Sequence, residues 1–93
     1  MILQFDWDIW NIQKNEEKHG ISSLEAESVF YDHDLVIFED IKHSRVETMW
    51  VCYGVSVYNK VLMLAYTVRK AKIRIISARR ASAKETKIYE ENK

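Results

Sequence analysis

Apolar and polar positions change their spacing within the last third of the chain. The run KIRIISAR at positions 72–79 is rich in β-branched isoleucine, which is typical of a pleated strand, and we expect a strand from Ile73 to Arg79. Ser82 is followed three residues later by Glu85, the pattern of a helix capping box. This part of the chain therefore predicts a strand that runs directly into a helix from about Ala83 to Glu91.

The first third of the chain reads as a short strand followed by two helices. Asp8 can cap the first helix, and Gly20 is a suitable left-handed stop. A second capping-box pattern, Ser22 with Glu25, opens the next helix. The predicted elements are a strand from Ile2 to Asp6 and helices from Ile9 to His19 and from Ser23 to Tyr31.

From Asp34 onward the spacing favours strands. The run from Leu35 to Phe38 is wholly apolar, so both of its faces should be covered. Asn59 tolerates the left-handed conformation that a tight turn between two strands requires. The predicted strands are Leu35 to Phe38, Thr48 to Val55 and Lys60 to Val68, with the polar stretch Glu39 to Glu47 as a loop.

A turn centred on Lys70 and Ala71 would fix the register of the last two strands. It pairs Thr67 with Arg74 and Ala65 with Ile76, so that Arg69, Thr67 and Arg74 share one sheet face. The core residues then lie on the opposite face: Leu62, Leu64, Tyr66, Ile73 and Ile75.

The element order is therefore βααββββα. It predicts an α+β fold, an antiparallel twisted sheet with helices packed on one side of it. With 93 residues, 47% of them hydrophobic, the chain from position 1 to 93 forms one domain with a single core.

Charge changes this picture, because it is unevenly distributed although the net charge is zero. Nine Lys and Arg stand against three Glu from Arg69 to the end, about +6, and the rest of the chain carries about −6. Such asymmetry indicates a basic functional face. The alternative is that the basic residues simply pair with the acidic ones.

Cysteine content and hydropathy indicate the compartment. Cys52 is the only cysteine and lies in an apolar run, which predicts a buried small side chain and a reducing environment rather than a nucleophile. The stretch from Met49 to Val68 is apolar enough to resemble a membrane span, but Asn59 and Lys60 at its middle favour a hairpin. We expect a cytoplasmic protein with no signal segment and no contact with a membrane.

The arginines provide the candidate chemistry. Arg69, Arg74 and Arg79 could hold a phosphate with their planar forks, aided by the free N–H groups at the start of the last helix. Cleaving RNA without a metal needs such charges and groups that transfer protons. The proton-transfer candidates are His19, His43, Glu47, Lys18 and Tyr89.

Each candidate also has a structural interpretation. His19 could simply be a cation that stabilises a helix C-terminus, and His43 and Glu47 could be solvated loop residues. The tryptophans and tyrosines could stack on bases but also suit a core or a protein interface. Asp32, His33 and Asp34 cluster without metal-ligand spacing, so neither a metal nor another cofactor is expected.

Several motifs together resemble the BrnT toxins of bacterial type II toxin-antitoxin systems. The matching residues are Phe5-Asp-Trp-Asp, Asn15, Lys18-His19-Gly20, Ala26, Val29-Phe30, Asp32, His43-Ser44, Glu47, Gly54, Tyr66-Thr67, Arg69 and Arg74-Ile-Ile-Ser-Ala-Arg79. They span nearly the whole chain in order.

This resemblance implies a RelE-like ribonuclease fold and metal-independent cleavage of mRNA. It also implies neutralisation by a cognate BrnA-like antitoxin. The toxin would contact operator DNA only through this antitoxin. Both a homodimer of the toxin and a heterotetramer with the antitoxin would be compatible with the resemblance. The predicted catalytic residues are Arg69, Arg74, Arg79, His19 and Glu47, and the predicted RNA-binding residues are Lys18, Thr67, Arg80 and Tyr89.

The chain departs from the family pattern at Met49, where an arginine is usual, at Ser23 and at Asn11. Arg45, four residues before Met49, is a candidate substitute. A catalytically inactive homologue that serves as the folded subunit of a DNA-binding repressor complex is therefore the alternative hypothesis.

Overall fold

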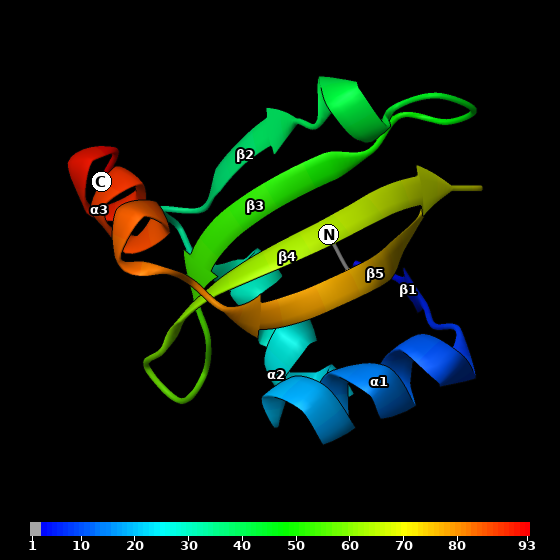
Figure 1. Cartoon of the computed structure of the whole chain (residues 1–93), viewed down its shortest axis with the longest axis horizontal. Coiled ribbons are helices and arrows are strands. Elements are labelled where there is room, and N and C mark those ends of the chain that lie inside the picture. Colours follow the sequence, from blue (N-terminus) through cyan, green and yellow to red (C-terminus); the bar gives the residue numbers. More distant parts are fainter. Residues whose placement is uncertain (1–2) are drawn as a thin grey trace.

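A single five-stranded sheet organises the computed structural model, which describes residues 3–93 (Figure 1). The strand order is β1-β5-β4-β3-β2. The elements are β1 (Phe5–Asp6), α1 (Ile9–His19), α2 (Ser23–Ser28), the 3-10 helix η1 (Val29–Tyr31), β2 (Val36–Glu39), the 3-10 helix η2 (Ile41–His43), β3 (Trp50–Val55), β4 (Val61–Arg69), β5 (Lys72–Arg80) and α3 (Ala83–Glu91). The predicted α+β class is confirmed, and Ile2, the first residue of the predicted strand, lies outside the described residues.

The helix ends follow the predicted caps. Asp8 accepts a hydrogen bond from the N–H of Trp10, and Gly20 ends α1 with a φ of 66°. At the start of α3, Ser82 and Glu85 form the complete reciprocal capping box. Local side-chain chemistry is therefore enough to fix where α1 and α3 begin.

The sheet is mixed, which corrects the expected all-antiparallel arrangement. β1 pairs with β5 in parallel, placing Asp6 beside Arg74 at that edge. A two-residue strand leaves too little pattern for its direction to be read from sequence. β2 is also a correction: it forms the other edge, and its Ile37 and Phe38 are 49% and 40% exposed rather than covered.

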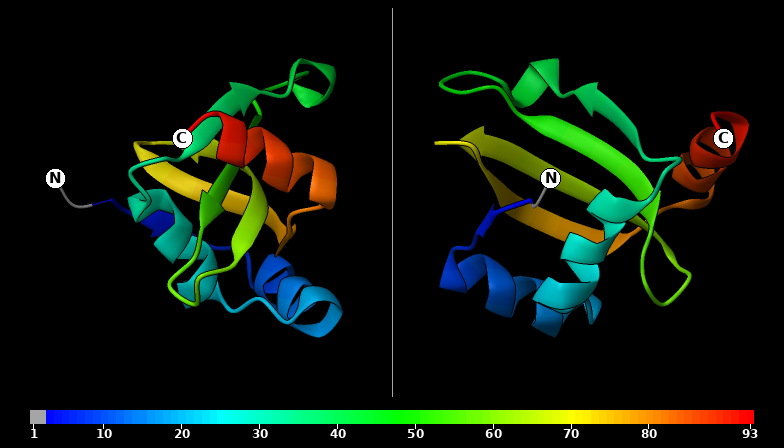
Figure 2. Two further views of the ribbon diagram at one scale, coloured as in Figure 1. Left: turned by 90° about the vertical axis from the view of Figure 1, so that its left-hand side faces the viewer. Right: turned by 180° about the vertical axis from the view of Figure 1, so that it is seen from behind.

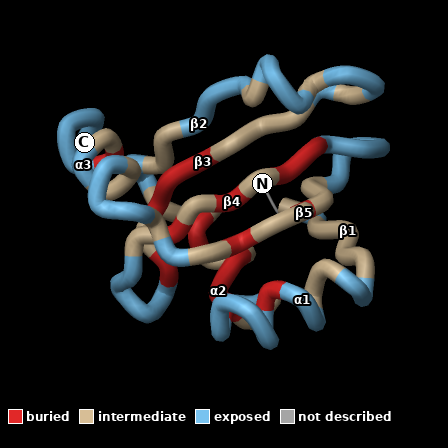
Figure 3. The backbone as a smooth tube through the Cα atoms, viewed as in Figure 1, coloured by how far each residue is buried: buried red, intermediate tan, exposed pale blue. Residues whose placement is uncertain are grey.

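The core lies between the sheet and the first two helices, as Figure 3 shows for the buried parts of β3, β4, β5 and α2. The predicted inward residues Leu62, Leu64 and Ile75 have no exposed surface, and Tyr66 has 6%. Asn15 ties α1 to this side, because its Oδ1 accepts a hydrogen bond from the N–H of Ala78, 3.2 Å away. We call this side of the sheet the core face.

α3 departs from the expected one-sided packing. It follows β5 at the end of the sheet away from the β4–β5 turn (Figures 1 and 2). Its Tyr89 donates a hydrogen bond to Asp32, 2.6 Å away, and its Glu85 reaches Arg79 on the side of the sheet opposite the core face. The helix therefore closes one end of the sheet.

Candidate functional site

A β-bulge brings the sheet arginines onto one face. Thr67 pairs with Arg74 as predicted, but Ala65 pairs with Ser77 instead of Ile76, because the register shifts between Ala65 and Tyr66. Residues 74 and 79 are an odd number apart and would face opposite sides of a regular strand. The extra residue of the bulge restores Arg79 to the side of Arg74. We call this side, opposite the core face, the arginine face.

Carboxylates neutralise all three of these arginines. Arg69 donates two hydrogen bonds to Glu47, and Arg74 contacts Asp6 and Asp8 at 3.2 Å each. Arg79 donates to both oxygens of Glu85, at 2.8 and 2.9 Å. For these residues the pairing alternative holds, and the expected set of free guanidinium groups is corrected.

Glu85 also fills the anion site expected at the start of α3. Its Oε1 accepts a hydrogen bond from the Ser82 N–H at 2.8 Å while both oxygens hold Arg79. These are the groups that were expected to hold a phosphate. The hydrogen bonds from Arg79 are the main reason that the pKa of Glu85 lies below its ordinary value.

Arg79 also lies too far along the strand to share one phosphate with Arg74. The two arginines pair with Met63 and Thr67, four residues apart on β4. At about 3.3 Å per residue this separation is about 13 Å. Arg69 and Arg74, in contrast, are diagonal neighbours near the β4–β5 turn.

Four other predicted residues are not accessible on the arginine face: two lie on another part of the molecule, and two are buried. His19 and Lys18 lie exposed in the last turn of α1, which packs toward the core face. Thr67 is 1% exposed and donates to the Thr48 carbonyl, and Tyr89 is 1% exposed and donates to Asp32. Neither hydroxyl is available to RNA, which corrects both expectations.

Two more of the predicted residues keep some accessibility. Arg80 is exposed at the end of β5. Glu47 keeps its carboxylate at the surface, and the hydrogen bonds from Arg69 are the main cause that lowers its pKa. Such a carboxylate stays ionised near neutral pH, so Glu47 is suited to hold Arg69 and not to donate a proton.

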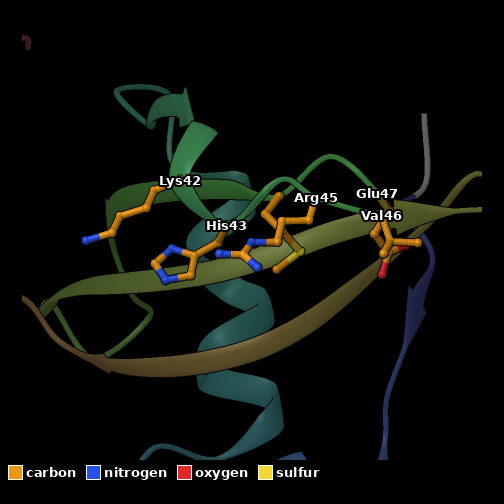
Figure 4. A pocket seen from close by; sticks show the side chains of 6 residues that line it. Lys42, His43, Arg45, Val46 and Glu47 are labelled. Atoms are coloured by element: carbon orange, nitrogen blue, oxygen red, sulfur yellow. The ribbon is translucent and has the colours of Figure 1, made fainter.

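The loop between β2 and β3 forms a hollow of about 360 Å³ lined by several cations. Figure 4 shows Lys42, His43 and Arg45 extending from this loop to the same side, where they overlap β4 in that view. Glu47, the partner of Arg69, lines the same hollow. We call Lys42, His43 and Arg45 with the hollow they line the loop site.

Asp40 fixes the imidazole of this site. Its Oδ2 lies 2.7 Å from Nδ1 of His43, so the ring donates from Nδ1 to the carboxylate and leaves Nε2 free. Sequence reasoning found His43 and Arg45 but missed Asp40 and Lys42. The signal that could have found Asp40 is its spacing of three residues from His43, which one helical turn brings together.

Ser44 holds the ends of this loop. Its hydroxyl donates to the Asp40 carbonyl at 2.7 Å and accepts from the N–H of Met49 at 2.8 Å. The N–H of Asp40 donates to the Met49 carbonyl at 2.8 Å. Met49, which stands where an arginine was expected, thus contributes its backbone to the loop site.

Acidic and thiol groups elsewhere have structural roles. Within residues 3–93 no three His, Cys, Asp or Glu side chains come together as metal ligands. Asp32 accepts hydrogen bonds from Tyr89 and from the N–H groups of Val55 and Asp34. Partial burial opposes ionisation of Asp32, but these bonds outweigh it and lower its pKa. Burial raises the pKa of Cys52 to about 12, so this thiol is inert.

In the described part of the chain no helix is long and apolar enough to cross a membrane.

Comparisons with known proteins give a family and a fold. The family model described as "Ribonuclease toxin, BrnT, of type II toxin-antitoxin system" matches residues 7–85. A crystal structure of the Brucella abortus ribonuclease toxin BrnT matches with a TM-score of 0.65 and 20% identity, covering 87% of this chain and 99% of that one. A search among curated proteins found no match. At this identity the structural likeness concerns the fold alone.

Proposed function

The chain belongs to the BrnT family of ribonuclease toxins of type II toxin-antitoxin systems, and from this premise we propose that it cleaves RNA at the loop site without a metal ion. The observation that carries the proposal is the His43–Asp40 pair, set among cations in one hollow. Membership in the family implies RNA as the substrate and an antitoxin as the partner.

The loop site offers the groups that attack by a 2′-hydroxyl requires. Lys42 and Arg45 would bind the phosphate and stabilise the charge that develops on it. Nε2 of His43 would take the proton from the 2′-oxygen, which then bonds to phosphorus and forms a 2′,3′-cyclic phosphate. The bond from phosphorus to the 5′-oxygen of the next nucleotide breaks, and this oxygen takes a proton from water. Asp40 would hold the ring in the tautomer that leaves Nε2 open.

The sheet arginines have a supporting role in this proposal. Glu47 holds Arg69 beside the loop site, where Arg69 would help to stabilise the charge on the phosphate. Arg69 and Arg45 would together take the place of the arginine that is absent at position 49. Arg74 and Arg79 are held by carboxylates and are not needed for this step, and Arg80 pairs with Leu62, which places it on the core-face side of the sheet. His19 and Lys18, in the last turn of α1, are not part of the proposed site.

A cleavage assay on a labelled RNA in the presence of EDTA tests the proposal. His43→Ala should lower the rate by roughly 100- to 10,000-fold, the usual contribution of a general acid or base. Added imidazole should restore part of that loss, which a purely structural effect would not allow. His33→Ala is the matched control, because His33 is exposed and lies outside the loop site. An unchanged rate in His43→Ala would exclude the mechanism.

The second candidate function is an inactive toxin homologue that serves as the folded subunit of a DNA-binding repressor complex. The neutralised sheet arginines and Met49 favour it. In both cases we propose a BrnA-like antitoxin as the partner, through which alone the toxin would contact operator DNA. A homodimer of the toxin and a heterotetramer with the antitoxin are both compatible with this proposal. Expression in bacteria separates the two candidates, because arrest of growth that His43→Ala relieves requires the ribonuclease, and unaffected growth favours the repressor subunit.

A further inference from the structure

A second hollow on the arginine face adjoins the loop site. It measures about 460 Å³; Lys42 lines both this hollow and the loop site, and Asp40, the partner of His43, lines this one. Its remaining lining consists of Phe38, Glu39, Ile41, Val51, Tyr53, Met63, Arg79 and Glu85. The volume lies within the range of roughly 300–1,000 Å³ typical of small-ligand sites. We call it the base pocket.

The base pocket has an accessible aromatic wall. Phe38 is 40% exposed, and its ring meets that of Tyr53 edge to face, with 5.2 Å between centroids and 73° between planes. Tyr53 is 6% exposed, so it supports Phe38 and presents little surface itself. Val51 pairs with Phe38 and Ala65, and Met63 pairs with Tyr53, which makes the floor apolar. One supported ring over an apolar floor suits a flat aromatic ligand.

The opposite wall is polar and offers both donors and an acceptor. Arg79 uses its Nη1 for Arg80 and Glu85 and its Nη2 for Glu85, while Nε donates no hydrogen bond within residues 3–93. Oε2 of Glu85 accepts a single hydrogen bond there. A guanidinium donor therefore stands next to a carboxylate acceptor. Nucleobase edges present donors and acceptors side by side in the same way.

We propose that the base pocket binds a nucleobase of the RNA, stacked on Phe38, while the adjacent cations of the loop site hold that nucleotide's phosphate. The inference rests on the proposed function for the identity of the loop-site ligand. Lys42, which lines both hollows, is the observation that joins the two subsites. Phe38 is then a specificity residue that binds substrate and takes no part in proton transfer.

Binding of nucleoside 5′-monophosphates, compared with ribose 5-phosphate, tests this inference without cleavage. A stacked base should strengthen binding roughly 5- to 100-fold over the sugar phosphate alone. Phe38→Ala should remove that difference, and Phe38→Tyr should keep it. Ile37→Ala is the matched control, since Ile37 is its exposed neighbour on β2 but pairs with Cys52 on the core face. Titration followed by NMR chemical shifts would give all the dissociation constants.

Two outcomes separate this inference from the proposed cleavage. If no variant cleaves RNA but Phe38→Ala abolishes the advantage of a base, the base pocket stands and the ribonuclease mechanism fails. If cleavage depends on His43 while monophosphates and ribose 5-phosphate bind equally well, or Phe38→Ala leaves their difference unchanged, the base pocket is overturned and the mechanism survives.

Discussion

At the scale of single residues, carboxylates decide what the arginines can do. Glu85 takes the place that a phosphate could occupy, because a carboxylate fits the arginine fork and the Ser82 N–H in the same planar way. Glu47 holds Arg69 similarly at the surface. An arginine can therefore lie on the arginine face and still be neutralised by a carboxylate. The side chains left to attract a phosphate are Lys42 and Arg45 of the loop site.

The ion pair between Arg79 and Glu85 should make stability depend on pH. Because the pKa of Glu85 is lowered in the folded state, the ion pair contributes its full stabilisation above pH 4.5, the ordinary pKa of a glutamate. This stabilisation is lost as the pH falls through the lowered pKa of Glu85. Glu85→Gln should cost about 1 kcal/mol at pH 7, because both side chains keep some exposure. Urea unfolding of both proteins at pH 7 and pH 3 measures the loss of free energy of unfolding in Glu85→Gln, and this loss should be smaller at pH 3.

Glu91→Gln, an exposed change on the same helix, serves as the control and should alter stability by less than about 0.5 kcal/mol. An equal cost of Glu85→Gln at both pH values would show that the charge of Glu85 is not what stabilises the protein.

At the scale of elements, the hairpin of β4 and β5 sets the geometry of the arginine face. Its turn uses Lys70 and Ala71 at φ of 50° and 64°, both in the left-handed region that residues with a side chain adopt at a cost. This turn fixes the register at Thr67 and Arg74, and the bulge at Ile76, opposite Ala65 and Tyr66, then decides which side Arg79 takes. One strained turn and one inserted residue thus arrange the face.

Relieving the turn should stabilise the protein. Lys70→Asn combined with Ala71→Gly introduces the residues that two-residue hairpin turns prefer, and should raise the free energy of unfolding by about 1 kcal/mol. The melting temperature should rise by roughly 4–8 °C for a domain of this size. Ala83→Gly, at a helical position of α3, should lower it. A decrease for the turn variant would mean that the native side chains compensate for the backbone cost.

At the scale of the whole molecule, the sheet separates two environments. The core face is covered by α1, α2 and η1, and Val29 of η1 and Leu35 approach the sheet closely at Gly54 of β3. The arginine face stays open between the loop site and α3, and both hollows lie along it. A sealed face supplies rigidity, and the other face is left free to bind a ligand.

Gly54→Ala tests how closely the layers are packed. A Cβ at this position would lie 2.7 Å from Cδ1 of Leu35 and 2.8 Å from Cγ1 of Val29, so the substitution should cost about 1–3 kcal/mol. Methyl NMR signals of Val29 and Leu35 should shift in this variant. Gly20→Ala meets no atom within 4 Å and should strain only the local backbone, at φ of 66°. Unshifted methyl signals in Gly54→Ala would contradict the close packing.

The sequence alone determined the elements that depend on local chemistry. Capping residues fixed α1 and α3, left-handed residues fixed the turns, and the apolar period fixed the core face of β4, because each acts within a few residues. Family membership followed from motifs spread along the chain.

Only the tertiary structure decided the state of the candidate site. Asp6 accepts a hydrogen bond from Arg74, 68 positions away in the sequence, and Tyr89 donates its hydroxyl to Asp32, 57 positions away. The bulge that turns Arg79 shows in no local pattern, and the folded loop brings Lys42, His43 and Arg45 to one hollow. Pairing of charges depends on distances through space, which neither composition nor periodicity contains.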